Sequence, residues 1–135
     1  MASERLALRW TVPEILLVED NPDTVEFLVR RLNDFGYGVR IARNGIEALH
    51  AIEDFIPAAV ILDINLPLMN GDDVCRKMRQ NPRTAEVPVI FVTAESEDRV
   101  RDLLNPTTTI CLEKAIKTKT LLEALSKLAP VSAQS

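Results

Sequence analysis

The sequence predicts an α/β protein, a doubly wound sandwich in which five parallel strands lie between helices on both faces. Four short apolar runs without alternation indicate strands that are buried on both sides of a sheet. Strands recur at intervals of roughly 20 to 30 residues with a helical pattern between them. This alternation is typical of consecutive right-handed βαβ units, and a parallel sheet follows from it.

The strands are predicted from the placement of apolar residues. The four apolar runs cover residues 15–18, 58–62, 87–92 and, more weakly, 110–112. A fifth segment, residues 39–42, alternates between apolar and other positions, as a half-exposed edge strand would. We therefore expect five strands, one of them at an exposed edge.

The helices are predicted from apolar residues at helical spacing. Such patterns occupy residues 25–35, 48–52, 74–78 and 121–128, and a further segment, 97–104, is short and very polar. Asp23 followed by Glu26 is interpreted as a capping-box-like helix start. Gly36 is interpreted as a C-terminal cap and Asn44 as an N-terminal cap.

Length and composition predict one globular domain over residues 13–129, with an N-terminal arm at 1–12 and a C-terminal tail at 130–135. The 135 residues are 47% hydrophobic and 27% charged, which excludes collagen-like and mostly disordered chains. A net charge of -4 argues against a nucleic-acid partner, because phosphate binding needs surplus Lys and Arg. No apolar run is long enough to span a membrane, so we expect a cytoplasmic protein without a membrane partner.

The candidate site follows from the topology, because ligands of open parallel sheets bind beyond the carboxyl ends of the strands. The residues that follow the apolar runs are Glu19 with Asp20, then Asp63, Thr93, and Glu113 with Lys114. The three carboxylates of Glu19, Asp20 and Asp63 would repel each other at this edge unless a cation lay among them. Mg²⁺ prefers such oxygen ligands. The sequence therefore predicts a magnesium site at this edge.

Four motifs in these segments resemble the receiver domain of two-component response regulators, the CheY-like family. They are ILLVEDNPDT at 15–24, VILDINLPLMNG at 60–71, VIFVTAES at 89–96 and CLEK at 111–114. Each is weak alone, but their order and spacing together are specific. The resemblance covers Glu14 to Leu128 and implies a flavodoxin-like sheet of strand order 2-1-3-4-5.

The resemblance implies a phosphoacceptor and a metal site. Asp63 would accept the phosphoryl group. Mg²⁺ or Mn²⁺ would be bound directly by Asp20, Asp63 and the backbone carbonyl of Asn65, and through a water molecule by Glu19. Haloacid-dehalogenase-like phosphatases also use a nucleophilic Asp, but they need a second Asp where this chain has Asn65.

Further roles follow from the same resemblance. Thr93 would donate a hydrogen bond to the phosphoryl oxygen and Lys114 would form an ion pair with it. Asn65 and Glu95 would flank the path of the hydrolytic water and set the lifetime of the phosphoryl group.

The sequence departs from the family at its output face, which comprises residues 97–104, 110–112 and 121–128. Ala115 stands where the family usually has a cis-proline, which implies either a non-proline cis bond or a rebuilt loop. Cys111 replaces the aromatic residue usually found three positions before the lysine. Rotation of an aromatic ring at this position therefore cannot report phosphorylation in this chain.

We thus expect a phosphorelay receiver in which Mg²⁺-dependent phosphorylation of Asp63 changes partner binding through the output face. Its only chemistry would be self-phosphotransfer and autodephosphorylation, so it would not be an enzyme. A histidine kinase or phosphotransfer protein would donate the phosphoryl group, a downstream protein would bind in trans, and a homodimer could form on phosphorylation. Two alternatives remain: a phosphorylation-independent interaction module, or the excised regulatory domain of a larger response regulator or hybrid kinase.

Overall fold

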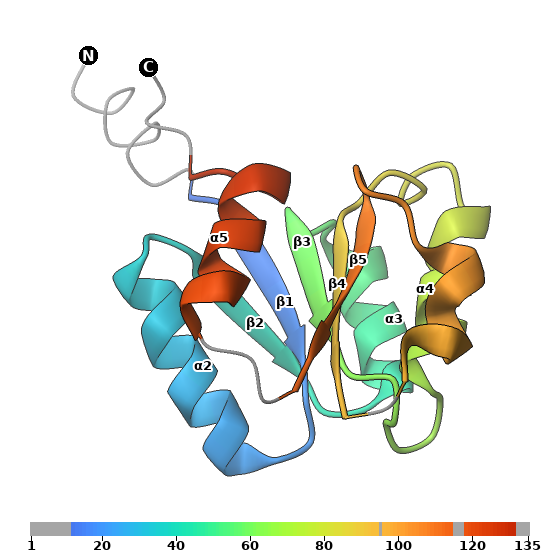
Figure 1. The fold of residues 1–135 in the computed structure, drawn as a ribbon, viewed down its shortest axis with the longest axis horizontal. Helices are drawn as coiled ribbons and strands as arrows, with labels where there is room; N and C mark the ends of the chain where they lie inside the picture. Colours follow the sequence, from blue (N-terminus) through green and yellow to red (C-terminus); the bar gives the residue numbers. More distant parts are fainter. Residues whose placement is uncertain (1–11, 95, 115–117, 132–135) are drawn as a thin grey trace.

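The structure is a computed structural model that describes residues 12–94, 96–114 and 118–131. A five-stranded parallel sheet of order β2-β1-β3-β4-β5 crosses the molecule (Figure 1), as the sequence analysis predicted. Its strands are β1 (Glu14–Val18), β2 (Gly38–Ala42), β3 (Ala59–Leu62), β4 (Val89–Thr93) and β5 (Thr109–Glu113). The proposed arm and tail lie almost wholly outside the described residues, so the domain boundaries stay predictions.

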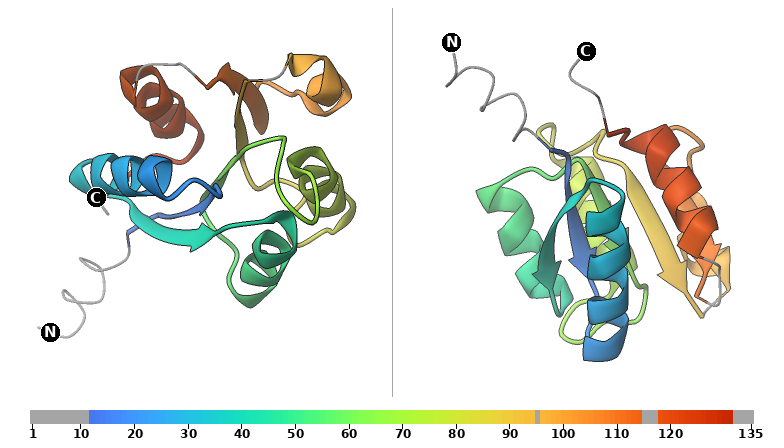
Figure 2. Two further views of the ribbon diagram at one scale, coloured as in Figure 1. Left: turned by 90° about the horizontal axis from the view of Figure 1, so that it is seen from below. Right: turned by 90° about the vertical axis from the view of Figure 1, so that its left-hand side faces the viewer.

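Helices cover both faces of the sheet (Figure 2). One face carries α2 (Pro22–Asp34) and α5 (Thr118–Leu128). The other carries α3 (Gly45–Asp54), α4 (Gly71–Gln80) and η1 (Glu97–Leu103), a 3₁₀ helix where a short polar helix was expected. No helix in the described ranges is long and apolar enough to cross a membrane.

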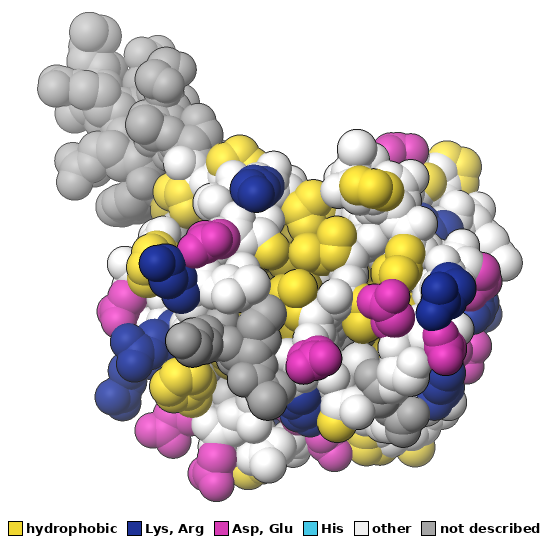
Figure 3. All heavy atoms as spheres, viewed as in Figure 1, with side chains coloured by type: hydrophobic (Ala, Val, Ile, Leu, Met, Phe, Trp, Pro, Cys, Tyr) yellow, Lys and Arg dark blue, Asp and Glu magenta, His cyan; other side chains and the backbone are white. Residues whose placement is uncertain are grey.

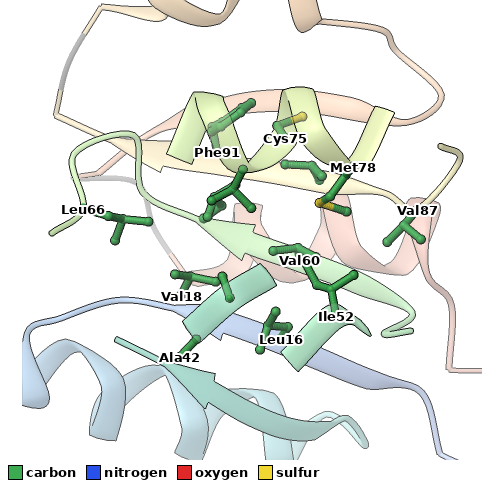
Figure 4. Close-up of a cluster of buried hydrophobic side chains, with 14 of the residues drawn as sticks. Leu16, Val18, Ala42, Ile52, Val60, Leu66, Cys75, Met78, Val87 and Phe91 are labelled. Atoms are coloured by element: carbon green, nitrogen blue, oxygen red, sulfur yellow. The ribbon is translucent and has the colours of Figure 1, made fainter. Parts of the chain in front are cut away.

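The two faces of the sheet bury separate apolar cores, because successive side chains of a strand point to opposite sides. Along β1, Leu16 and Val18 pack on the side of α3 and α4, with Ile52, Cys75, Met78 and Phe91 among their neighbours (Figure 4). Ile15 and Leu17 pack on the side of α2 and α5. This double burial explains why successive positions along the central strands, such as Ile15 to Val18 in β1, are apolar without alternation.

The strand β5 differs from the expectation, since its apolar run predicted burial on both faces. It lies at the edge of the sheet with β4 as its neighbour, and Ile110, Cys111 and Leu112 are only half-buried. Figure 3 shows apolar side chains gathered on this side of the molecule, between α5 and η1. A short apolar run does not distinguish a central strand from an edge strand whose covering helices leave a gap.

The start of α2 also corrects a prediction. Asn21, rather than Asp23, is the N-cap, and its side-chain oxygen accepts hydrogen bonds from the backbone N–H groups of Asp23 (2.9 Å) and Thr24 (3.3 Å). Pro22 occupies the first turn, where its missing N–H costs nothing. The prediction of a capping box formed by Asp23 and Glu26 is therefore wrong, because both residues lie inside the helix.

Two other cap predictions are confirmed. The Asn44 side chain accepts a hydrogen bond of 2.8 Å from the Glu47 backbone N–H at the start of α3. Gly36 follows the C-cap residue Phe35 of α2 and has a φ of 94°, a left-handed conformation that favours glycine. Asn44 caps α3 at the carboxyl edge of the sheet, which carries the candidate site, whereas Gly36 lies at the opposite edge, where the chain enters β2.

Candidate functional site

Two buried carboxylates lie side by side at the carboxyl edge of the sheet. β1 and β3 are hydrogen-bonded neighbours in which Val18 pairs with Leu62, so Glu19 and Asp63 follow at the same level. Only 5% of Glu19 and 7% of Asp63 is exposed to solvent. Asp20, the next residue after Glu19, is exposed. Two acidic groups are thus held close together with little water around them.

Lys114 lies between these two carboxylates. Its Nζ is 2.8 Å from Asp63 Oδ2 and 3.6 Å from Glu19 Oε1. The hydrogen bond to Asp63, together with the negative charges of Asp63 and Glu19, raises the pKa of Lys114 above its ordinary value, against the opposing effect of partial burial. Lys114 is therefore a cation at neutral pH, and it offsets the charge of the acid pair.

Backbone N–H groups also hold the carboxylates. The Asn65 N–H donates to Asp63 Oδ1 over 3.2 Å, and the Asn21 N–H donates to Glu19 Oε2 over 3.1 Å. The two oxygens of Asp63 thus contact different groups, a backbone amide on one side and an ammonium on the other. This fixes the orientation of the Asp63 carboxylate at the mouth of the site.

The first residue of α4 presses against the backbone of Asp63. A Cβ atom at Gly71 would lie 2.0 Å from the Asp63 carbonyl oxygen and 3.1 Å from Leu62 Cγ. The Gly71 N–H also donates to the Ile64 carbonyl over 2.8 Å. Gly71 is the last residue of the motif at 60–71, and its missing side chain allows α4 to approach the acidic residue.

Thr93 and Lys114 meet at the same edge through the pairing of β4 with β5. Thr93 ends β4 opposite Glu113 and is 2% exposed, and its carbonyl accepts a hydrogen bond of 2.8 Å from the Lys114 backbone N–H. A shift of the Thr93 backbone would therefore be transmitted directly to Lys114.

Arg99 is a residue that sequence reasoning missed. Its guanidinium donates to the side-chain oxygen of Asn65 over 3.2 Å and to Asp72 Oδ1 over 3.2 Å. Asp72 is 9% exposed and belongs to the first turn of α4. No local signal marked Arg99, because a charged residue in a short polar helix is normally assigned to the solvated surface.

A cavity of about 300 Å³ adjoins the site. Glu19, Asp63 and Lys114 line it together with polar residues of α2 and α5, and its apolar lining comes from β1, β3 and β4 as well as from these two helices. The acid pair therefore faces an opening lined by both polar and apolar side chains.

Three further candidates remain from the sequence analysis. Glu95 and Ala115 lie outside the described residues, so the predicted roles of Glu95 and of the bond that precedes Ala115 stay predictions. Cys111 is half-buried in β5, and desolvation raises the pKa of its thiol.

The oxygen donors at this edge suit a hard divalent cation by their chemistry, since carboxylate and carbonyl oxygens are its preferred ligands. Their present arrangement is not that of a bound ion. In the described part of the chain no three His, Cys, Asp or Glu side chains are placed to hold a metal as they stand. Lys114 bridges Glu19 and Asp63, and the neighbouring Asp20 is exposed to solvent.

Comparisons with known proteins agree with this architecture. A family model described as the response regulator receiver domain matches residues 15–126. The DNA-binding response regulator MtrA of Mycolicibacterium smegmatis is 37% identical over 83 residues, which cover 62% of this chain and 35% of that protein. The chain spans less than half the length of the first curated relatives that it matches.

Two solved structures show the same fold. The receiver domain of a signal transduction histidine kinase from Syntrophus aciditrophicus has a TM-score of 0.76 and 32% identity, covering 90% of this chain and 93% of that one. The receiver domain of the sensor histidine kinase PA1611 from Pseudomonas aeruginosa, solved with a magnesium ion in its active site cleft, has a TM-score of 0.73 and 29% identity. That match covers 87% of this chain and 97% of the other.

Proposed function

The chain belongs to the response regulator receiver domain family, and on this basis we propose that Asp63 is its phosphoacceptor. The contact of 2.8 Å between Lys114 Nζ and Asp63 Oδ2 carries the proposal. In this contact an ammonium that is charged at neutral pH lies against a buried carboxylate, and a backbone amide holds the other oxygen of that carboxylate. A nucleophile fixed in this way is ready for in-line attack on an incoming phosphoryl group.

The reaction is a transfer between two phosphoryl carriers. A carboxylate oxygen of Asp63 forms a bond to phosphorus while the bond from phosphorus to the donor breaks, and the electron pair of that bond leaves with the donor. With a phosphohistidine the leaving group is an imidazole, and with acetyl phosphate it is acetate. The product is an aspartyl phosphate, and Lys114 offsets its added negative charge.

Mg²⁺ or Mn²⁺ would be held by Asp20, Asp63 and the Asn65 backbone carbonyl, with Glu19 acting through a water molecule. When bound, such an ion offsets negative charge on the transferring phosphoryl group. Support comes from the oxygen donors at this edge and from the magnesium ion in the active site cleft of the PA1611 receiver domain. Asp20 is exposed beside the buried Glu19, so its carboxylate is accessible to an ion from solvent.

Phosphorylation would change partner binding through the face formed by η1, β5 and α5. The phosphoryl group would attract the Thr93 hydroxyl and the Lys114 ammonium, and the ends of β4 and β5 would move with them. A histidine kinase or phosphotransfer protein would be the donor in a cytoplasmic signalling pathway. The chain would act as a switch for a downstream protein, with possible homodimerisation, rather than as an enzyme with a small-molecule substrate.

Intact mass spectrometry after incubation with acetyl phosphate and Mg²⁺ tests the acceptor. The wild type is expected to gain one phosphoryl group, and Asp63→Asn is expected to gain none. Asp54→Asn is the matched control, because Asp54 is an exposed aspartate at the end of α3. Chelation of the metal should abolish the gain in the wild type.

The opposite result would favour a different function. If the wild type gains no mass from acetyl phosphate or from a histidine kinase, the acceptor proposal is wrong. The chain would then be better described as a phosphorylation-independent interaction module, for which the departure at Cys111 is the motivating observation.

A further inference from the structure

Arg99 connects η1 to the residue beside the acceptor. It lies in the first turn of η1, and its two terminal nitrogens reach different partners: Nη1 donates to Asn65 Oδ1 and Nη2 donates to Asp72 Oδ1, each over 3.2 Å. Its side chain is 39% exposed, whereas that of Asp72 is 12% exposed. The guanidinium fork therefore spans from the start of α4 to the loop that follows Asp63.

A second arginine anchors this contact. Arg76 on α4 donates to Asp102 Oδ2 over 3.0 Å and to the backbone carbonyl of Arg99 over 3.4 Å. Its Nη2 also lies 3.8 Å from Asp72 Oδ2. Arg99 is thus held at its backbone by Arg76 and at its side chain by Asp72, so its position beside Asn65 does not depend on Asn65 alone.

Asn65 is the residue whose orientation this arrangement controls. Its backbone N–H contacts Asp63 Oδ1 at 3.2 Å, so its side chain begins next to any group attached to that carboxylate. The side-chain oxygen of Asn65 is directed to Arg99. Because the amide is planar, this bond also fixes where the Asn65 NH₂ group points.

We propose that Arg99 is a positioning residue that holds Asn65 in the orientation that aligns water for hydrolysis of the Asp63 phosphoryl group. The inference rests on the proposed function and extends it to the lifetime of the phosphorylated state. In hydrolysis the water oxygen forms a bond to phosphorus while the bond between phosphorus and the Asp63 oxygen breaks. The electron pair of that bond returns to the carboxylate, and both water protons leave with dihydrogen phosphate.

Loss of Arg99 should slow this reaction. A polar group held by more contacts needs less ordering before it can orient a reacting water, so removing the Arg99 contact should weaken this effect without abolishing it. We expect Arg99→Ala to lengthen the phosphoryl lifetime about threefold to tenfold, in the lower part of the range of coupling between contacting residues. Asn65→Ala should have a similar effect, and the double variant should match Asn65→Ala alone.

The lifetime is measured by intact mass after the phosphodonor is removed. Arg99→Lys tests whether the position of the guanidinium or its charge matters. Lysine keeps the positive charge but lacks the two terminal nitrogens that reach both partners. This variant should resemble Arg99→Ala. Arg101→Ala is the matched control, because exposed Arg101 pairs locally with Asp98 within η1 and should leave the lifetime unchanged.

A spectroscopic readout needs no phosphodonor. The side-chain amide NMR signals of Asn65, assigned by their loss in Asn65→Ala, should shift in Arg99→Ala and stay in place in Arg101→Ala. Unmoved signals in Arg99→Ala would overturn the positioning role whatever the phosphorylation result.

The outcomes separate the two proposals. A labelled wild type whose lifetime is unchanged or shortened by Arg99→Ala, or an additive double variant, contradicts the positioning role and leaves Asp63 as acceptor. A lifetime restored by Arg99→Lys also contradicts it, because charge alone would then suffice. A wild type that is never labelled contradicts the acceptor proposal, and the lifetime inference fails with it.

Discussion

At the scale of single residues, the site consists of two buried carboxylates and a lysine ammonium that contacts both of them. Glu19 and Asp63 are both buried, and isolated carboxylates there would be costly. Lys114 reaches both of them from β5, while β4 lies between β5 and β3 in the sheet. The lysine thus stabilises the acid pair by offsetting its negative charge.

The Lys114 ion pair should make stability depend on pH in the alkaline range. The pKa of Lys114 is raised in the folded state, so its contribution is complete below the unfolded pKa near 10.5 and is lost as pH rises through the higher folded pKa. The difference in unfolding free energy between wild type and Lys114→Met should therefore be constant around neutral pH and should shrink above about pH 10.5. Urea denaturation at a series of pH values measures it.

Lys119→Met is the control for this measurement, because Lys119 is exposed on α5. The unfolding free energy of Lys119→Met should differ little from that of the wild type at every pH. A Lys114→Met difference that persists undiminished at the highest pH would show that the aliphatic stem of Lys114, rather than its charge, stabilises the fold.

The two cysteines should differ in reactivity. Burial raises the pKa of both thiols, but Cys75 is 0% exposed in the core, whereas Cys111 is half-buried in the edge strand β5. Since only an accessible thiolate reacts, iodoacetamide at about pH 8 should modify Cys111 first and Cys75 only after unfolding. Mass spectrometry counts the adducts, and Cys111→Ser should show no early adduct. Equal rates at both cysteines would contradict this burial.

At the scale of elements, the approach of α4 to β3 shapes the site. Gly71 lies so close to the Asp63 carbonyl that no side chain fits between them. Elsewhere, the short 3₁₀ helix η1 is pinned to α4 through arginine and aspartate side chains rather than by apolar packing alone. Polar contacts of this kind are weaker than a packed core, which fits the movement that the proposed switch would require of this face.

Gly71→Ala should therefore destabilise the fold. The added Cβ would meet the Asp63 carbonyl oxygen at 2.0 Å, a backbone atom that cannot rotate away. We expect a loss of about 1 to 3 kcal/mol in unfolding free energy, the usual cost of overpacking. Denaturant titration measures this loss.

Gly38→Ala provides the matched control in β2. A Cβ there would lie 3.6 Å from a Val12 side-chain atom, an ordinary contact, so its effect should be within about 0.5 kcal/mol of zero. Equal stability of the two variants would mean that α4 can shift away from Asp63 without cost.

At the scale of the whole molecule, the parallel sheet gathers residues that are far apart in the sequence. Strand ends near residues 19, 63, 93 and 114 meet at one edge because every strand runs in the same direction. The helices on both faces keep this edge rigid by burying two separate cores. Binding at the edge should therefore stabilise the entire fold.

Mg²⁺ should raise the thermal midpoint of unfolding if the proposed metal site exists. A ligand that binds only the folded state adds about 2.7 kcal/mol when its concentration is a hundredfold above Kd. Asp20→Asn should lose most of this Mg²⁺-induced shift, whereas the shift of Asp54→Asn should equal that of the wild type. Differential scanning calorimetry with and without Mg²⁺ measures it, and an unchanged shift in Asp20→Asn would exclude Asp20 as a ligand.

Much of this fold could be predicted from the sequence because its signals are local. Apolar runs marked the strands, a polar run marked η1, and Asn44 was recognised as a cap from its immediate neighbours. The acid pair and Lys114 were placed at one edge because the topology of parallel sheets determines where strand ends lie. These inferences need only periodicity, chain direction and the chemistry of adjacent residues.

Other features depend on side chains that meet only after folding. The sequence did not show that Asn21 caps α2 ahead of Asp23, or that β5 is left half-exposed between α5 and η1. Nor did it indicate that Arg99 would bind Asn65, 34 residues away. Local sequence determined the secondary structure and the candidate residues, while the tertiary structure decided their contacts, because those depend on the distances between elements rather than on the residues within one.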